Sequence, residues 1–473
     1  MQVMKGGLDG LLGKGIPFDA VAPASGNEGS AKPKVAHEIL GKPLVSYVAD
    51  AARAAGVTDL VAVVGHGREQ VEPLVADRCR IVVQDQQLGT ADAVARCREA
   101  LADAEGSLLV LSGDCPLITP ETLSSLVYAR EGADAGVAVL SMRPQNPFGY
   151  GRIVRESSGD FTRIVEQKDC TDEEAAIGEC NAGFYCFDAK LLFQALEQVS
   201  TDNAQGEFYL TDVIEIARNA GRTVLALEAP DADECLGVNS RMQLAQATKI
   251  MQRRINRRHL ASGVTMMDPD LVWIGPDVQI EQDVELLPMT FLLGSTKVAS
   301  GTVVGPNTRL TDVIVGHDCR IDETVALESE IEDGCNVGPR AYIRPQTHLC
   351  RNAKVGTHVE IKKSMIGEGS KVPHLSYIGD TTMGAGVNIG AGSITCNYDG
   401  QNKWPTVIGD RAFVGSDTMM VAPVKIGSDV VVGAGSVITD DVSDRALALG
   451  RARQVEIPEY QERKRRKQEQ AEN

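Results

Sequence analysis

Aliphatic residues followed by glycine recur every six residues along the C-terminal part of the chain. Met383-Gly384 is followed six residues later by Ile389-Gly390, and the same pairs continue, with irregular steps, between residues 274 and 437. A unit of six residues is too short to bury its aliphatic side chain alone, so successive units must stack and join these side chains into one interior. The period therefore predicts a β-helix built from hexapeptide repeats.

This period breaks between Gly390 and Gly409. The segment from Thr395 to Trp404 is polar, rich in turn-forming residues and too long for one repeat unit. Long excursions from a regular solenoid are typical of functional loops. The segment is therefore a candidate functional loop.

The first half of the chain shows a different pattern, in which short aliphatic runs alternate with amphipathic, alanine-rich segments. Thr119 is the expected N-cap of one helix and Pro120 its first residue. Alternating strands and helices predict an α/β domain whose parallel sheet is covered on both faces and binds ligands at the carboxyl ends of its strands. We expect strands at residues 60–64, 80–83, 107–111 and 135–140, and helices at residues 43–55, 91–102 and 120–129.

The two patterns divide the 473 residues into parts. The segment 241–260 is basic, but its apolar residues fit one helix face, which favours a connecting arm over a phosphate-binding patch. The basic run 463–467 lies in a charged tail and is interpreted as a solvated terminus. We expect an N-terminal extension (1–18), an α/β domain (19–239), a helical linker (240–264), a hexapeptide-repeat domain (265–455) and a charged tail (456–473).

Composition narrows the class of protein. Hydrophobic residues make up 43% of the chain and charged residues 24%, as in soluble globular proteins, and a net charge of −18 argues against nucleic-acid binding. The N-terminus has no run typical of a signal peptide, and no stretch approaches the roughly 18 apolar residues of a membrane span. The eleven cysteines form no CxxC pair and no cluster with histidine at metal-ligand spacing. We therefore expect a cytoplasmic protein with reduced thiols that binds neither membrane nor nucleic acid.

Asp114 is the first candidate for chemistry, because it follows the predicted strand 107–111. A carboxylate at the end of a parallel strand suits Mg²⁺ that carries a triphosphate, although an aspartate that simply forms a turn explains the position equally well. Gln84, Gly89 and Thr90 lie in a glutamine-rich segment that opens a helix. Glutamine can read the edge of a base, and glycine lets a ligand approach the backbone closely.

His374 and Tyr377 interrupt the aliphatic pattern of the repeats. Histidine suits the general base that deprotonates an amine, although alone it could simply fill a corner of the coil. The cationic and polar residues in the same stretch, which suit a sugar phosphate, favour the catalytic interpretation. These residues are Arg344, Lys362, Lys363, Tyr377 and Asn388.

The order of several motifs resembles that of a known family, the bacterial bifunctional N-acetylglucosamine-1-phosphate uridyltransferase/glucosamine-1-phosphate acetyltransferases, or GlmU family. The resemblance covers residues 19–455, and the loop Thr395-Cys396-Asn397-Tyr398-Asp399-Gly400 is its most diagnostic string. It implies a Rossmann-like α/β nucleotidyltransferase domain with a mostly parallel sheet, followed by a left-handed parallel β-helix of hexapeptide repeats. The motifs of the first half are Pro33-Lys34-Val35, 84–91, Gly113-Asp114-Cys115-Pro116-Leu117, 148–153, 164–169, Asn181-Ala182-Gly183, 203–212 and Gly237-Val238-Asn239.

This resemblance also implies roles for single residues. In the uridyltransferase half, it assigns Mg²⁺ to Asp114 and Asn239, and UTP or the UDP-sugar to Lys34, Gln84, Gly89, Thr90, Ser112, Gly113, Asp114, Gly151, Glu166, Asn181 and Asn239. In the acetyltransferase half, it assigns glucosamine 1-phosphate to Arg344, Lys362, Tyr377 and Asn388, and acetyl-CoA to Ala391, Asn397, Tyr398, Ser416, Ala434 and Arg451. His374 matches the residue that removes the proton from the amine.

The reaction implied is the transfer of the acetyl group from acetyl-CoA to glucosamine 1-phosphate, followed by the reaction of N-acetylglucosamine 1-phosphate with UTP. By analogy with other hexapeptide acyltransferases, we expect a homotrimer. The same two-domain layout occurs in noncatalytic scaffold subunits of nucleotide-exchange factors, but His374 and the Asn397 loop contradict that alternative.

One segment departs from the family. Members open with a glycine-rich loop whose arginine stabilises the transferring phosphoryl group, whereas residues 21–32 contain no arginine and include Pro23 and Glu28. Lys32 could supply a charge but not the two-pronged hydrogen bonding of arginine. A positioned cation in such a site is worth roughly 10³ to 10⁵ in rate. A chain that is only an acetyltransferase, with an N-terminal domain that binds without catalysing, therefore stays open as an alternative.

Overall fold

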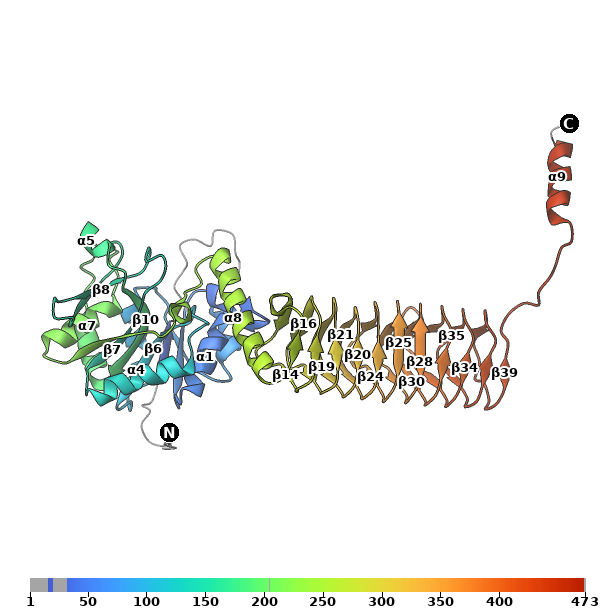
Figure 1. Ribbon diagram of the computed structural model, residues 1–473, viewed down its shortest axis with the longest axis horizontal. Coiled ribbons are helices and arrows are strands. Elements are labelled where there is room, and N and C mark those ends of the chain that lie inside the picture. The colour runs from blue at the N-terminus through green and yellow to red at the C-terminus, as the bar shows by residue number, and fades with distance from the viewer. Residues whose placement is uncertain (1–15, 20–31, 204, 472–473) are drawn as a thin grey trace. The chain divides into compact units, whose positions relative to one another are not determined.

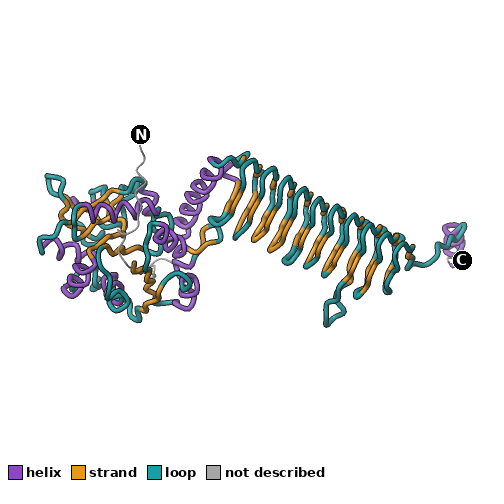
Figure 2. The backbone as a smooth tube through the Cα atoms, turned by 90° about the horizontal axis from the view of Figure 1, so that it is seen from below, coloured by secondary structure: helices purple, strands orange, loops and turns teal. Residues whose placement is uncertain are grey.

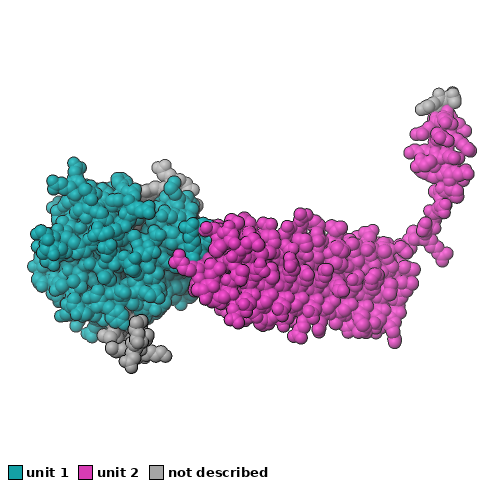
Figure 3. Space-filling view, viewed as in Figure 1, with its two compact units in different colours: residues 1–254 teal, residues 255–473 magenta. Residues whose placement is uncertain are grey.

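The computed structural model describes residues 16–19, 32–203 and 205–471, and the chain separates into two compact units, residues 1–254 and 255–473 (Figure 3). The boundary falls inside α8 (Arg241–Ala261), the helix that occupies the basic segment after the α/β domain. Among the described residues, no helix is long and apolar enough to cross a membrane.

The first unit is built on a twisted sheet in the order β11-β7-β10-β6-β1-β4-β5, with β8 and β9 attached beside β10. Neighbouring strands are parallel except at β10, which runs antiparallel to β6, β7 and β8, and between β8 and β9, which are antiparallel to each other. The prediction of a mostly parallel sheet is therefore confirmed, with β10 as an antiparallel strand within it. The strands are β1 (Ile16–Asp19), β4 (Leu60–Val64), β5 (Arg80–Val83), β6 (Ser107–Ser112), β7 (Val137–Met142), β8 (Arg152–Arg155), β9 (Phe161–Val165), β10 (Cys180–Asp188) and β11 (Val224–Glu228), and β2 (Glu38–Ile39) pairs with β3 (Lys42–Pro43) as a hairpin.

Helices cover both faces of this sheet, as the alternating pattern predicts. On one face, α1 (Leu44–Ala54), α2 (Arg68–Val75) and α4 (Pro120–Gly132) pack against alternate residues of β4 and β6. On the other face lie α3 (Thr90–Arg96), α6 (Ala189–Ala195) and α7 (Leu210–Asn219). Successive residues of β4 and β6 thus bury their side chains alternately under one helical layer and the other. The short helices are η1 (Lys34–Ala36), α5 (Asp172–Ala175), η2 (Leu196–Gln198) and η3 (Ala232–Cys235).

The predicted elements differ from the observed ones mainly at their ends. The Thr119 side chain caps α4 by accepting a hydrogen bond from the Thr122 amide at 3.3 Å, as expected. The helix predicted at residues 91–102 ends at Arg96, because most of the following amides bond to carbonyl groups three residues back and form successive turns. β1 begins at Ile16, before the expected start of the domain, and lies between β4 and β6.

The second unit is the left-handed parallel β-helix that the hexapeptide period and the family resemblance lead one to expect. Its strands are short, and coil stacks on coil along one axis (Figures 1 and 2). One face consists of β12 (Thr265–Met266), β15 (Glu285–Leu286), β18 (Val303–Val304), β20 (Arg320–Ile321), β22 (Asn336–Val337), β25 (Lys354–Thr357), β28 (Lys371–His374), β31 (Asn388–Ile389), β34 (Phe413–Val414), β37 (Val431–Val432) and β39 (Leu447–Ala448).

The remaining strands of the β-helix form a second, folded sheet that supplies the other two faces. One of them contains β13 (Val272–Ile274), β16 (Thr290–Leu293), β23 (Tyr342–Ile343), β26 (Glu360–Lys362), β29 (Tyr377–Gly379), β32 (Ile394–Cys396), β35 (Met419–Val421) and β38 (Val437–Ile438). The other contains β14 (Gln279–Ile280), β17 (Lys297–Val298), β24 (His348–Leu349), β27 (Met365–Ile366), β30 (Thr381–Met383), β33 (Thr406–Ile408) and β36 (Val424–Ile426). The longer strands β19 (Arg309–Val315) and β21 (Val325–Ile331) belong to both faces, and η4 (Pro269–Leu271) precedes β13.

Close stacking explains the repeating aliphatic-glycine pair. The aliphatic members, such as Val355 and Ile366, are fully buried. A Cβ atom on the glycine that follows would collide with the next coil, with the carbonyl oxygen of Pro373 at Gly356 and with that of Gly384 at Gly367. Glycine is therefore needed at these positions because neighbouring coils approach each other closely, and not only because a corner is tight.

Buried hydroxyl groups tie consecutive coils together at the corners. Ser370 donates a hydrogen bond to the Gly384 carbonyl at 2.8 Å, and its oxygen accepts one from the Val387 amide at 2.9 Å. Similar serine and threonine residues occupy corners along the stack. Corner backbone groups, which no strand can pair, are satisfied in this way.

The charged tail ends in α9 (Tyr460–Ala471), whose described side chains are all exposed.

Candidate active sites

The side chain of Lys34 lies at the centre of the candidate nucleotide site. The ammonium group of Lys34, in η1, forms an ion pair with Asp114 and donates a hydrogen bond of 2.6 Å to the side-chain oxygen of Asn239. Asp114 follows β6 and Asn239 precedes α8, so the fold brings together residues from three distant segments. Only 8% of the Lys34 side chain and 18% of the Asp114 side chain are exposed.

This arrangement fits a divalent metal ion. A carboxylate oxygen and an amide oxygen, both of the hard type that Mg²⁺ prefers, point to one position that a positive charge now occupies. The strand-end aspartate is thus part of a cation-binding group and not only a turn residue. The residues present are the right kind to hold Mg²⁺ once Lys34 has a phosphate to pair with.

A cavity of about 210 Å³ opens beside this cation. It lies at the carboxyl end of β6, where the α/β pattern places a ligand. Five of the residues expected at the nucleotide site line it, namely Lys34, Thr90, Ser112, Asp114 and Glu166. Gly183, Tyr185, Tyr209 and Thr211 also line it. All except Tyr185 lie in motifs noted in the sequence, but none of the four was assigned a role.

The residues expected to hold the sugar lie near one another. Gly151 packs against Glu166, since a Cβ atom at Gly151 would stand 3.4 Å from the Glu166 carboxylate. Burial is the main cause that raises the pKa of Glu166. Asn181 donates to the Tyr185 hydroxyl at 2.7 Å and accepts from the Gly183 amide at 3.1 Å. Glu166 and Tyr185 both line the cavity.

Gln84 lies apart from this group. Its side-chain amide donates to the Gly89 carbonyl at 3.3 Å and to Asp92 at 2.8 Å, and it borders a different, open cavity of about 660 Å³ with Gly65 and His66. The structure therefore does not bring Gln84 into the cavity that holds Lys34.

Gly89 and Thr90 contact the segment 208–210 at the start of α7 and hold it in place. Gly89 has a φ of +119°, and a Cβ atom there would meet the backbone of Phe208. Thr90 accepts a hydrogen bond from the Leu210 amide at 3.1 Å. Both residues thus position Tyr209 and Thr211 on the cavity wall.

The altered glycine-rich stretch, residues 21–32, lies outside the described residues except for Lys32. The ammonium group of Lys32 forms an ion pair of 2.9 Å with Glu38.

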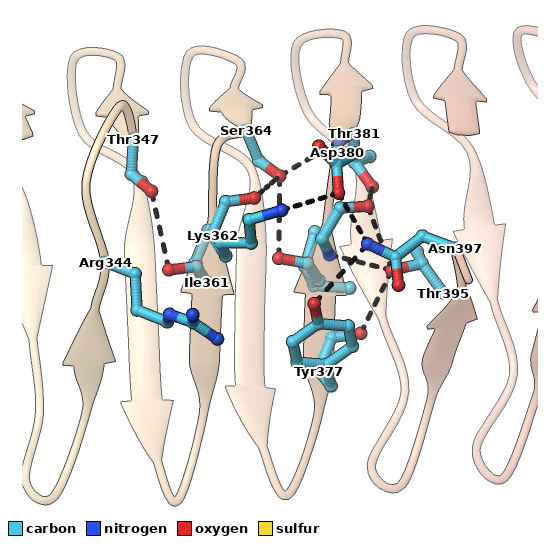
Figure 4. Close-up of polar contacts among 12 residues, drawn as sticks. Arg344, Thr347, Ile361, Lys362, Ser364, Tyr377, Asp380, Thr381, Thr395 and Asn397 are labelled. Atoms are coloured by element: carbon cyan, nitrogen blue, oxygen red, sulfur yellow. Dashed lines mark hydrogen bonds and ion pairs between the residues drawn. The ribbon is translucent and has the colours of Figure 1, made fainter. Parts of the chain in front are cut away.

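In the β-helix, a polar network connects several residues that are expected to bind the amino sugar (Figure 4). Asp380 is its centre, because its carboxylate accepts hydrogen bonds from Lys362 at 3.0 Å and from Asn397 at 2.6 Å. Asn397 also lies 3.4 Å from the Tyr377 hydroxyl. Burial disfavours the charge of Lys362, but the bonds to its neighbours outweigh burial and raise its pKa. The network joins three successive coils, and sequence reasoning did not identify Asp380.

Further cations surround this network. Lys403, from the excursion loop, lies close to Lys362, and this neighbour lowers the pKa of Lys403. Arg344 contributes to the same positive field and forms an ion pair of 2.8 Å with Glu360. Lys362 and Lys403 carry two positive charges, and the Asp380 carboxylate neutralises only one of them. The remaining positive charge is available for an anionic ligand. The sequence did not indicate a role for Lys403, because its position beside Lys362 depends on the conformation of the excursion loop.

The excursion loop is held in shape by its own residues. Asp399 accepts hydrogen bonds from the Asn402 amide at 2.6 Å and the Trp404 indole at 2.7 Å, and these donors lower its pKa to about 2. The Trp404 amide donates to the Asn397 carbonyl at 2.8 Å. The loop is therefore a compact structure that presents Asn397 and Lys403 to the network.

His374 ends β28 and its side chain is exposed. The next residue, Leu375, has a φ of +47°, so the chain turns sharply after the histidine. Among the described residues, no hydrogen bond or ion pair joins the imidazole to a neighbour, so the structure does not connect His374 to the Lys362 network. Asn388, in β31, is half-buried and pairs with Lys371, three residues before His374.

Four of the six residues expected around acetyl-CoA form a column along one corner of the stack. The Ala391 carbonyl accepts from the Asp417 amide at 2.7 Å, and the Ser416 carbonyl accepts from the Gly435 amide at 2.8 Å. Arg451 donates to the Ala434 carbonyl at 2.8 Å. Ala391, Ser416, Ala434 and Arg451 thus follow one another from coil to coil. Tyr398 is 60% exposed, and its hydroxyl donates to the Gly400 carbonyl at 2.6 Å.

The fold and these sites define a transferase with a nucleotidyltransferase domain and a hexapeptide acyltransferase domain. The model of a MobA-like NTP transferase domain matches residues 27–208. The hexapeptide repeat of succinyl-transferase matches residues 330–359, and the bacterial transferase hexapeptide (six repeats) matches residues 405–440.

Curated relatives extend this similarity to most of the chain. The bifunctional protein GlmU of Syntrophomonas wolfei is 47% identical over 427 residues, which cover 90% of this chain and 95% of the relative. The bifunctional protein GlmU of Carboxydothermus hydrogenoformans is 48% identical over 428 residues, 90% of this chain and 96% of the relative. The chain belongs to the GlmU family. It is a bifunctional transferase with uridyltransferase and acetyltransferase activities, and none of these comparisons favours the alternative of an acetyltransferase alone.

Proposed function

We propose that this protein makes UDP-N-acetylglucosamine in two steps. Acetyl-CoA first acetylates glucosamine 1-phosphate, and UTP then reacts with N-acetylglucosamine 1-phosphate to give the product and pyrophosphate. The observation that carries the proposal is the group of cations around Lys362, which matches a phosphorylated amino sugar in charge. The Lys34, Asp114 and Asn239 group supports the second step.

The acetyl transfer requires a free amine and a base. His374 takes a proton from the amine of glucosamine 1-phosphate, and its exposed imidazole is available for this role. The amine nitrogen then attacks the thioester carbonyl, the carbon–sulfur bond breaks, and coenzyme A leaves as the thiol after protonation. Arg344, Lys362, Tyr377 and Asn388 hold the sugar phosphate during this reaction.

Coenzyme A binds along the column of Ala391, Ser416, Ala434 and Arg451. The exposed backbone and small side chains of this column leave room for a long ligand, and the Arg451 guanidinium provides a positive charge for its phosphates. Asn397 and Tyr398, at the start of the excursion loop, bind acetyl-CoA as well, and Asn397 also belongs to the Lys362 network. The start of the loop therefore lies where the acetyl donor meets the acceptor.

The uridylyl transfer needs the group around Lys34. Asp114 and Asn239 would hold Mg²⁺, which neutralises the negative charge of the triphosphate. Lys34 pairs with phosphate oxygens, Gly151, Glu166 and Asn181 hold the sugar, and Gln84, Gly89, Thr90, Ser112 and Gly113 hold the nucleotide. Thr211 and Tyr209 add polar groups to the same cavity.

The proposal extends to the state of the protein in the cell. We expect a homotrimer in the cytoplasm that binds neither membrane nor nucleic acid. The free thiols of all the cysteines, which lie in the described part of the chain, support a reducing compartment.

Two assays test the proposal separately. The release of coenzyme A from acetyl-CoA and glucosamine 1-phosphate measures the first step, and the release of pyrophosphate from UTP, Mg²⁺ and N-acetylglucosamine 1-phosphate measures the second. The wild-type protein should give both products. If coenzyme A release is no faster than in a His374→Ala variant, the acetyltransferase assignment fails, and pyrophosphate release no faster than in Asp114→Ala removes the uridyltransferase assignment.

A further inference from the structure

Three side chains with different metal-binding atoms meet on one corner of the β-helix. Glu332 follows β21, His348 lies in β24, and Cys350 comes two residues later. A carboxylate oxygen, an imidazole nitrogen and the thiol sulfur all lie within 4.8 Å of one another. None of these residues belongs to the Lys362 network or to the coenzyme A column.

The stack fixes the positions of these residues. β24 pairs with β21 in parallel, with His348 beside Glu330, and the Glu332 amide donates to the Leu349 carbonyl at 2.9 Å. The Cys350 amide donates to the Ile366 carbonyl in the following coil at 2.9 Å. Because each backbone position is held by a neighbouring coil, the three side chains come together without a change in the fold.

The carboxylate is also oriented toward the histidine. One oxygen of Glu332 accepts a hydrogen bond from the Arg351 amide at 2.8 Å, and the other lies 2.7 Å from the Nε2 atom of His348. Outer hydrogen bonds of this kind hold ligands in place at metal sites. The His348 and Glu332 side chains are each 37% exposed, so an ion can enter from solvent.

Negative charge surrounds the thiol. Glu332, Glu330 and Glu368 lie close enough to Cys350 for their charges to act on its thiol. A divalent cation at this corner would be attracted by the three carboxylates and would favour the thiolate form of its sulfur ligand. The local field therefore favours a cation over an anion.

We propose that Glu332, His348 and Cys350 bind a divalent transition-metal ion of the zinc type, with solvent in the remaining position. One nitrogen, one sulfur and one oxygen ligand suit Zn²⁺, whereas Mg²⁺ takes oxygen ligands and is a poor match for a thiolate. The ion would link two consecutive coils and stabilise this part of the solenoid. The sequence hides this site, because only the coil register brings Glu332 to His348 and Cys350.

Cobalt is a suitable probe, because a Co²⁺–thiolate bond gives a charge-transfer band in the near ultraviolet that oxygen ligands do not. Full-length protein titrated with Co²⁺ should develop this band with one equivalent per chain, and Zn²⁺ should remove it. His348→Ala and Cys350→Ser should each weaken Co²⁺ binding by at least the roughly tenfold that the loss of even an outer partner causes. Cys170→Ser, which changes another half-buried cysteine, should leave the band unchanged.

A second measurement does not depend on the variants. Zn²⁺ should slow the alkylation of Cys350 in the wild-type protein, as followed by mass spectrometry of its peptides, and should leave the alkylation rate of Cys170 unchanged. If no thiolate band forms in the wild type, if the band persists in both variants, or if Zn²⁺ does not protect Cys350, the three residues are a hydrogen-bonded surface group and the proposal is wrong. These outcomes do not bear on the two transferase activities.

Discussion

The two candidate active sites of this chain differ in how far their positive charge is neutralised by neighbouring side chains. In the α/β unit, the single cation Lys34 is neutralised by Asp114 and held by Asn239, in a site that is largely buried. In the β-helix, Lys362 shares Asp380 with Asn397, and Lys403 adds a further charge nearby. The first site has oxygen atoms for an incoming cation, and the second has excess charge for an incoming anion.

This difference follows from how each fold builds a site. Parallel strands of an α/β sheet end at one edge, so a few loops bring polar groups to a single point. A β-helix has no such edge, and its site must be assembled from outward-facing residues of successive coils. The chemistry that each domain can support therefore depends on its architecture.

The largest effect should come from the removal of Asp114. Asp114→Ala deletes a carboxylate that we expect to hold Mg²⁺, and an effect of several kcal/mol corresponds to a loss of about 10³-fold or more in the rate of pyrophosphate release. Coenzyme A release should not change, because the acetyl site lies in the other unit. A parallel loss of both activities would show that the two sites are not independent.

Removal of His374 should have the next largest effect. His374→Ala should lower the rate of coenzyme A release by about 10² to 10⁴, since a general base contributes this much, and should spare pyrophosphate release. His358→Asn is the matched control, because His358 occupies an exposed corner position with a φ of +56° that asparagine tolerates. Near-normal coenzyme A release by His374→Ala would contradict the assignment.

Lys403 offers a smaller, more specific test of the anion site. Lys403→Ala should raise the KM for glucosamine 1-phosphate by about tenfold, because one charged hydrogen bond contributes roughly 1.5 to 3 kcal/mol. The KM for acetyl-CoA should stay the same. Exposed Lys425, on another face of the β-helix, provides the control substitution Lys425→Ala. Equal effects of the two substitutions would mean that only the overall charge matters.

The substitution Glu166→Gln should have the smallest effect, and this effect should be on the stability of the first unit. Because burial raises its pKa in the folded state, the native protein is penalised once pH rises above the ordinary value of a glutamate and the carboxylate ionises. Glu166→Gln should therefore raise the unfolding temperature of the first unit at neutral pH, and the gain should disappear in acid below that value. A gain that is independent of pH would mean that burial of the charge is not its cause.

The sequence predicts the folds of both units well, because each depends on local periodicity. The buried Val355 and Ile366 lie where the six-residue period puts them, and the end of α3 at Arg96 is missed because turns continue the helical pattern. The antiparallel direction of β10 is also missed. Hydrophobic periodicity does not encode strand direction.

The sites are harder to predict from the chain alone. Asp380 and Lys403 were not identified, because their contacts with Lys362 depend on which coil lies beside which. The role of Gln84 at the nucleotide stays a prediction, since its amide bonds to Asp92 and the residue lines a cavity other than that of Lys34. For Asp380 and Lys403, the neighbours come from other coils, and the sequence gives the residue type but not its partners.

The close stacking at Gly356 and Gly367 restricts how this protein can change its length. A side chain at either position would collide with the coil above, and a partial repeat would turn every later outward residue to a different face. The solenoid can therefore grow or shrink during evolution only by complete turns. A turn gained beyond Arg451 would leave the acetyl site intact, whereas a turn lost between Lys362 and Asn397 would divide it.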